Sequence, residues 1–194
     1  EISYIESKRN ILLKALMRLS IKCRFGNVFH VFLSDHIRAD KVFNSGNYII
    51  INHPCFFGGE KTQRIVDEKD KPRFVFSYVG MASYGKGLKC FEEVSSSFSE
   101  FGEYEFVVAG KVVEADFESD SISYFSRDFL PERKVDNILK ESSCALFFYG
   151  EDYDWIASGA VLDCVRYRIP VLALKSKIFI ELEESLGFVK CFDS

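Results

Sequence analysis

The stretch GEDYDWIASGAVLDCVRYRIPV, residues 150–171, decides the predicted fold of this chain. Directly before it, the apolar run Cys144–Tyr149 predicts a buried strand. Inside it, an acidic loop leads to Ser158, where a helical pattern begins that ends at Ile169–Pro170. A second apolar strand, Val171–Leu174, follows. The order strand, loop, helix and strand predicts a βαβ unit of a parallel sheet.

The same alternation extends to both sides of this unit. Strands are expected at 27–33, 47–52, 74–79, 104–109 and 121–125, and helices after Lys86-Gly87, at 131–141 and near 181–186. Alternating strands and helices predict an α/β fold, a doubly wound, Rossmann-like parallel sheet with helices on both faces. Ligands of such sheets bind at the carboxyl ends of the strands.

The N-terminal segment 1–24 has a different pattern. Its apolar residues lie on one side of a predicted helix, and its lysines and arginines lie off that stripe. Because the chain begins with Glu1, we expect a piece of a longer protein, in which 1–24 is a helical connector to a missing N-terminal half. Residues 25–194 would then form one Rossmann-like domain.

Composition excludes several classes of protein. The net charge is −4 and no basic block is present, which argues against nucleic acid as a partner. The six cysteines form no CxxC pair, and we expect reduced core residues, among them Cys90, Cys144 and Cys164, in a cytoplasmic protein. No set of residues has metal-ligand spacing. No apolar run approaches the ~20 residues that span a bilayer.

The helix that starts after Ser158 is a candidate anion site. Amide groups at a helix N-terminus favour phosphate, and small residues such as Ser158 and Gly159 let it come close. Asp163, one turn further, could reach a ribose hydroxyl, and Asp154 in the preceding loop could bind a sugar. The alternatives are an exposed helix aspartate and an acidic loop that complements the helix dipole.

A second candidate is the loop GMASYGKG, residues 80–87. Gly80 ends a predicted strand, and Lys86 lies at the start of a helix, where its ammonium could meet a phosphate. The spacing matches neither a GxxxxGK[ST] loop nor GxGxxG. The alternative is a glycine-rich turn that carries a solvated lysine.

Together these segments resemble the C-terminal, donor-binding half of GT-B fold glycosyltransferases, in the family 4-like group with a Gly-Arg-x5-Lys-Gly loop and an E-x7-E motif. The resemblance extends over about residues 28–190. The segments that carry it are VG at 79–80 with KG at 86–87, FVVAG at 106–110 and ASGAVLDCVRYRIPVLA at 157–173. In that group the second glutamate lies seven residues before a proline, as Asp163 lies before Pro170.

The resemblance implies a glycosyltransferase of the hexosyltransferase type that acts in polysaccharide or lipopolysaccharide synthesis. The donor-binding residues that it implies are Gly80, Lys86, Tyr124, Phe125, Ser158, Gly159 and Asp163. In this scheme Lys86 binds the diphosphate of a nucleotide-sugar donor, Asp163 holds the ribose, and Tyr124 and Phe125 flank the base. Asp154 and Lys86 would be the catalytic residues.

The same resemblance sets the expected partners. The nucleotide-diphosphate sugar is a substrate, and neither a further cofactor nor a metal is expected. The acceptor would be a glycan or a lipid-linked glycan, bound with the help of the missing N-terminal half. The expected location is the cytoplasm, with peripheral association at the inner face of the membrane through the missing half.

Four positions depart from the pattern of the group. Its loop arginine is Met81, its first motif glutamate is Trp155, its second is Asp163, and its turn glycine is Arg168. These changes leave the donor and the stereochemistry open. They also leave open a non-catalytic half that binds nucleotides or a partner within a glycosyltransferase complex. A third possibility, a Rossmann-like enzyme such as a nucleotide-sugar epimerase, is disfavoured by the lack of GxGxxG.

Overall fold

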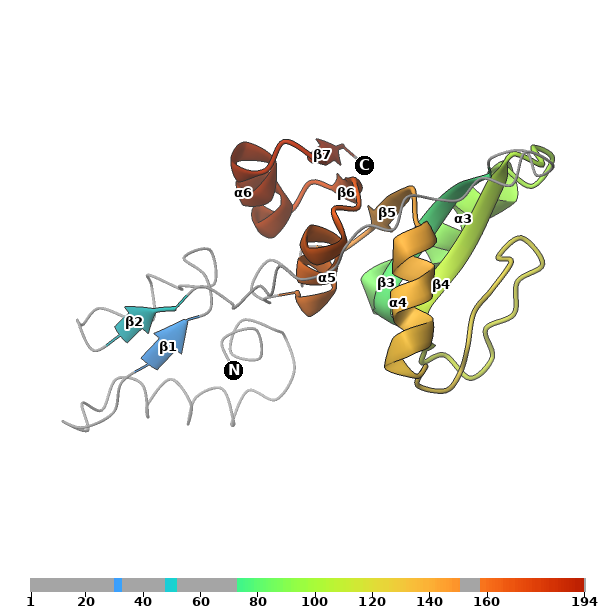
Figure 1. The fold of residues 1–194 in the computed structure, drawn as a ribbon, viewed down its shortest axis with the longest axis horizontal. Helices are drawn as coiled ribbons and strands as arrows, with labels where there is room; N and C mark the ends of the chain where they lie inside the picture. The colour runs from blue at the N-terminus through green and yellow to red at the C-terminus, as the bar shows by residue number, and fades with distance from the viewer. Residues whose placement is uncertain (1–29, 33–47, 52–72, 151–157, 194) are drawn as a thin grey trace.

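The computed structural model describes residues 30–32, 48–51, 73–150 and 158–193. The predicted helix at 1–24 and the loop with Asp154 and Trp155 lie outside these ranges. The main body is a five-stranded, all-parallel sheet with helices on both faces (Figure 1). This confirms the predicted α/β, Rossmann-like architecture.

Five strands form the sheet in the order β4-β3-β5-β6-β7. Their bounds are β3 (Phe74–Ala82), β4 (Tyr104–Val112), β5 (Cys144–Phe147), β6 (Val171–Leu174) and β7 (Val189–Phe192). A separate parallel pair consists of β1 (His30–Phe32) and β2 (Tyr48–Ile50). The central strand β5 is buried along its whole length, as a continuous apolar run predicts for a parallel strand.

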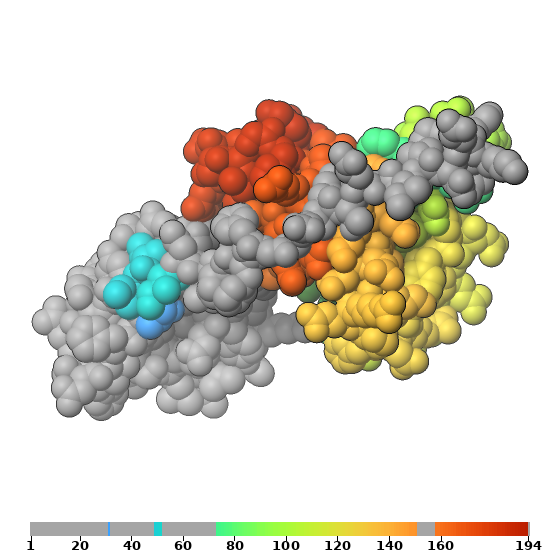
Figure 2. All heavy atoms as spheres, viewed as in Figure 1, coloured from blue at the N-terminus to red at the C-terminus, as the bar shows by residue number. Residues whose placement is uncertain are grey.

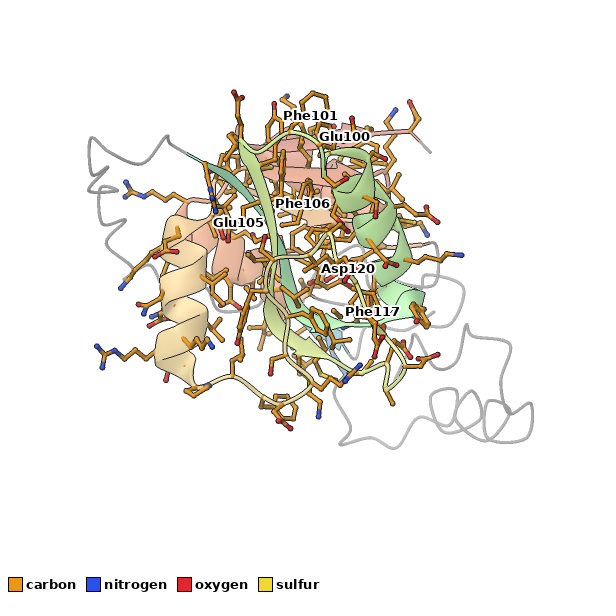
Figure 3. The ribbon with its side chains drawn as sticks, turned by 90° about the vertical axis from the view of Figure 1, so that its right-hand side faces the viewer. Glu100, Phe101, Glu105, Phe106, Phe117 and Asp120 are labelled. Carbon is orange, nitrogen blue, oxygen red and sulfur yellow. The ribbon has the colours of Figure 1, made fainter. Side chains whose placement is uncertain are left out.

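The helices divide the core into two clusters. The helical elements are η2 (Tyr84–Lys86), α3 (Leu88–Ser97), α4 (Glu132–Glu141), α5 (Gly159–Tyr167) and α6 (Lys177–Ser185). Phe147, Cys164 and Phe179 are buried on the face that α4, α5 and α6 cover, here called the α5 face. Phe91 and Phe106 are buried on the opposite face, the α3 face. Figure 3 shows α3 and α4 on opposite sides of the strands.

The prediction of a strand at 121–125 is wrong, because this segment forms no regular strand. Only one parallel bridge, between Val107 and Tyr124, joins this segment to β4. Its flanking hydrogen bonds run from the Val108 amide to the Tyr124 carbonyl at 2.8 Å and from the Ser123 amide to the Phe106 carbonyl at 2.9 Å. At the start of this segment, Ser121 joins a serine cluster with α3, in which the Ser95 and Ser121 hydroxyls lie 2.5 Å apart.

Other boundaries also differ from the prediction. The last helix, α6, begins at Lys177 rather than near Glu181, and the strand β7 after it was not predicted. Cys144 and Cys164 are buried as expected, but Cys90 is exposed on α3. The physical reason is that Cys90 follows the buried Leu88 by two residues, which places it on the outer side of the helix.

The strand order fixes where a ligand would bind. Counting the bridge at Tyr124 as a vestigial third strand, the order is 3-2-1-4-5-6, that of the Rossmann fold. The order reverses between β3 and β5, and the crevice outside the carboxyl ends of these strands is the usual ligand position. On the α5 face, α4 and α5 lie side by side next to this point, and Figure 2 shows the golden atoms of α4 next to the darker orange atoms of α5.

Candidate phosphate-binding site at the strand-order reversal

Gly80 lies where β3 meets the start of α5. Its φ is +93°, in the region that favours glycine. A Cβ atom at this position would lie 3.2 Å from the Cβ of Ala160, the second residue of α5. Glycine therefore allows the carboxyl end of β3 and the N-terminus of α5 to come together.

The loop after β3 is closed by its own hydrogen bonds. The amides of Lys86 and Leu88 donate to the Ser83 carbonyl at 2.9 and 3.0 Å, and the Gly87 amide donates to the Tyr84 carbonyl at 3.1 Å. The buried Tyr78 hydroxyl donates to the Lys86 carbonyl at 2.9 Å. These three amides are used within the loop, so an anion would be bound by other groups, among which the Lys86 ammonium carries a positive charge.

A contact of Gly87 brings this loop to the end of β5. The φ of Gly87 is +80°, and a Cβ atom there would lie 2.3 Å from the Cβ of Phe148. The next residue, Tyr149, is buried, and its hydroxyl lies 3.1 Å from the Ser158 Oγ. Lys86 and Ser158 therefore belong to segments that meet at one edge of the sheet, joined through residues 148 and 149.

The N-terminus of α5 carries amides that its capping residue does not use. Ser158 is the N-cap residue, yet it makes no side-chain capping bond because its hydroxyl pairs with Tyr149. The first amides of any α-helix have no partner inside the helix, and they point outward along its axis. At α5 the second residue, Ala160, lies against Gly80 at the carboxyl end of β3, so this helix N-terminus is close to the point where the strand order reverses. A helix N-terminus at such a place is suited to a phosphate.

The Lys86 side chain is partly withdrawn from water. It is of intermediate exposure, and burial lowers the pKa of its ammonium below the ordinary lysine value of 10.5. A desolvated ammonium interacts more strongly with an anion than a fully hydrated one, because the effective dielectric constant around it is lower. An anion placed beside Lys86 would therefore interact more strongly with its ammonium than with that of a fully exposed lysine.

Asp163 lies on the side of α5 that faces α4. Burial raises the pKa of its carboxyl, Arg166 lowers it, and Asp136 of α4 raises it. One turn further, the buried Tyr167 hydroxyl donates a hydrogen bond to the Asp136 carboxylate. Asp163 is thus one helical turn from the N-terminus of α5, at the α4–α5 boundary, in a position that could contact a sugar held beside the phosphate site.

Two expected base-flanking residues lie on different faces of the sheet. Tyr124 pairs in register with Val107, and the Lys134 ammonium of α4 lies 4.3 Å from the centroid of its ring, so Tyr124 lies on the α5 face. Phe125 packs edge-on against Phe117, with ring centroids 5.3 Å apart, in the cluster of the α3 face. The structure therefore does not bring Phe125 together with the other candidate residues.

Sequence reasoning missed a pair at the same edge. The Lys111 ammonium lies 4.6 Å from the centroid of the Phe129 ring. Lys111 follows Gly110 near the end of β4, and Phe129 precedes α4. The signal in the sequence was an aromatic residue in the short stretch SRDFLP, residues 126–131, directly before the predicted helix.

The structure leaves parts of the expected site undescribed. Asp154, the expected sugar-binding and catalytic residue, lies outside the described residues. Within the described ranges, no three acidic, histidine or cysteine side chains are grouped so that they could hold a metal ion. None of the helices in those ranges combines the length and the hydropathy that a bilayer crossing requires.

Comparisons with known proteins add no identification to this geometry. No protein-family model matches the chain, and no curated protein has a significantly similar sequence.

Proposed function

We propose that this chain is the donor-binding half of a glycosyltransferase and binds a nucleotide-diphosphate sugar at the carboxyl edge of the sheet, between β3 and β5. One observation carries the proposal: Gly80, the Lys86 loop and the N-terminus of α5 converge at the point where the strand order reverses. The order of the segments GMASYGKG and ASGAVLDCVRYRIPVLA along the chain supports the same proposal.

The chemistry of sugar transfer explains why these groups would be needed. Cleavage of the bond between the sugar and the diphosphate leaves additional negative charge on the departing diphosphate. The Lys86 ammonium and the α5 amides would stabilise this charge more in the transition state than in the ground state. Removal of one such group typically costs about 3 kcal/mol of transition-state stabilisation.

Isothermal titration calorimetry with UDP, GDP and ADP tests the proposal. At least one of these nucleotides should bind, and Lys86→Ala should weaken its affinity by at least about tenfold. The matched control is Lys89→Ala, because Lys89 is an exposed lysine at the second position of the next helix, α3. If no nucleotide binds, or if both variants lose affinity equally, the diphosphate site is not where we place it.

A non-catalytic, nucleotide-binding half of a glycosyltransferase complex is the second candidate. It is favoured by Met81, an apolar side chain that is 48% exposed at the end of β3, where the resembling group has a cationic arginine. This candidate predicts the same nucleotide binding without hydrolysis or transfer of the sugar when the chain is supplied with nucleotide sugars and an active partner.

A further inference from the structure

We infer that Phe129, with Lys111 against its ring, is the platform on which the nucleobase of the ligand stacks. This inference rests on the proposed function and deepens it, because it names the part of the site that would recognise the base. The expected base-flanking residue Phe125 cannot serve this purpose, since its ring packs against Phe117 in the core of the α3 face.

The segment with Phe129 crosses the ligand edge of the sheet. The Val112 amide donates to the Ser126 carbonyl at 2.8 Å, which ties the start of this segment to the end of β4. Three residues after Phe129, α4 begins on the α5 face. Figure 3 shows this stretch passing beneath the lower end of the strands to the start of α4. Phe129 is therefore held at the carboxyl edge, on the side of α4.

Exposure and the lysine contact together favour a stacking role. Phe129 is 73% exposed, the highest value among the large hydrophobic side chains of the described ranges. A single exposed phenylalanine is common on protein surfaces and does not indicate a binding site by itself. Here, however, an ammonium 4.6 Å from the centroid holds the ring by a cation–π interaction. The ammonium lies over the ring and leaves the opposite ring face for a planar ligand.

Lys111 connects this ring to the phosphate site. In the β3–β4 ladder it pairs in register with Met81, the residue after Gly80. Because residues in register point to the same face, and Tyr78 and Ala82 belong to the α3 face, Met81 and Lys111 point to the α5 face. The platform is therefore one strand away from the N-terminus of α5. A ligand that joins an aromatic base to a diphosphate could place the base on the Phe129 ring and the diphosphate at the N-terminus of α5.

The test compares nucleoside diphosphates with inorganic pyrophosphate. Phe129→Ala should weaken the binding of UDP, GDP or ADP by about 5- to 150-fold, the range measured for loss of one stacked base. Its affinity for pyrophosphate should equal that of the wild type. Phe101→Ala is the matched control, since Phe101 is 57% exposed but lies in the turn before β4, at the opposite edge (Figure 3).

A second variant provides a direct signal of stacking. In Phe129→Trp the nucleotide should quench the added tryptophan fluorescence and affinity should be retained. Equal nucleotide affinity of Phe129→Ala and the wild type would overturn the inference while leaving the proposed function intact. Parallel losses for nucleotides and pyrophosphate would overturn it as well. Failure of the wild type to bind either probe would overturn the proposed function and this inference with it.

Discussion

A methyl group on Gly110 would lie 1.9 Å from the carbonyl oxygen of Gly80. The two glycines face each other in register in the β3–β4 ladder, directly beside the candidate phosphate site. The obstacle is a backbone atom of the neighbouring strand, so no side-chain rotation could relieve the overlap. The close pairing of the two strands at the ligand edge therefore depends on glycine at position 110.

Gly110→Ala should consequently destabilise the protein by about 3 kcal/mol or more, because β3 and β4 must separate or the residue must distort. Gly102→Ala is the control, since nothing lies within 4 Å of a Cβ atom there, and its effect should stay within about 0.5 kcal/mol. Urea denaturation followed by circular dichroism measures both. Equal midpoints for the two variants would contradict the close approach of Gly80 and Gly110.

The pH dependence of nucleotide binding should reveal the desolvated Lys86. Burial lowers the pKa of its ammonium from 10.5, so in the unliganded protein it loses its proton at a lower pH than an ordinary lysine. Affinity for UDP should therefore decrease as the pH rises through this lowered pKa, still below 10.5. Over the same pH range the contribution of Lys86 to the free energy of unfolding should increase, because the unfolded chain keeps a proton that the folded state has lost.

Lys86→Arg separates this effect from other alkaline changes. Arginine stays protonated throughout the accessible range, so the alkaline loss of affinity should disappear in this variant. Titration calorimetry between pH 7 and about 10 measures it. A wild type and a Lys86→Arg variant with the same pH profile would show that another group controls binding.

The sequence predicted the elements that form the candidate site because their signals are local. The strand at Val171–Leu174 has the predicted bounds, and α5 begins directly after Ser158 as expected. A buried parallel strand is a continuous apolar run, and a helix start is a matter of small residues and periodicity. Both features can be recognised without knowing what the element packs against.

The missed elements depend on tertiary contacts. β7 has four residues, like β6, but its sequence VKCF includes a lysine and is not the continuous apolar run that predicted β6. The segment at 121–125 has alternating apolar residues, but Ser121 bonds to the serine cluster with α3, and only Tyr124 forms a bridge. The role of Phe129 depends on Lys111, eighteen residues away, which no local pattern could show.

The free energy of unfolding should depend on pH through the Tyr167 hydroxyl at the α4–α5 boundary. Burial and the hydrogen bond to Asp136 raise the pKa of its hydroxyl from 10.0 to about 12. Between these values the unfolded chain loses a proton that the folded protein keeps, so the free energy of unfolding should decrease as the pH rises from 10 to 12. Tyr167→Phe should lack this part of the decrease, which is obtained as the difference between the two curves of stability against pH.

At neutral pH the same substitution should cost about 1.5–3 kcal/mol, the usual value for a hydrogen bond to a charged group. Asp136→Asn provides the complementary test, since the amide oxygen can still accept the bond but the charge is gone. It should lose less stability than Tyr167→Phe. If Tyr167→Phe follows the wild type at all pH values, the hydroxyl is not bonded to Asp136 in solution.

Arg168 ends α5 in a conformation that suits glycine. Its φ of 55° and ψ of 41° are left-handed, and it is the one non-glycine residue of the described ranges with a positive φ. Its amide donates to the Val165 carbonyl at 3.1 Å, so this conformation closes the helix before Pro170 and β6. A left-handed conformation costs an ordinary L-residue roughly 1–2 kcal/mol.

Arg168→Gly should therefore stabilise the protein by up to about 1 kcal/mol, since the greater freedom of glycine in the unfolded chain offsets part of the relieved strain. Arg168→Val should destabilise it, because a branched Cβ tolerates the left-handed region least. Thermal unfolding should rank the proteins as glycine, then arginine, then valine at position 168. A valine variant as stable as the wild type would mean that α5 ends in a different conformation in solution. The hydrogen bond from the Ile169 amide to the Cys164 carbonyl, which leads the chain into β6, would then not form as described.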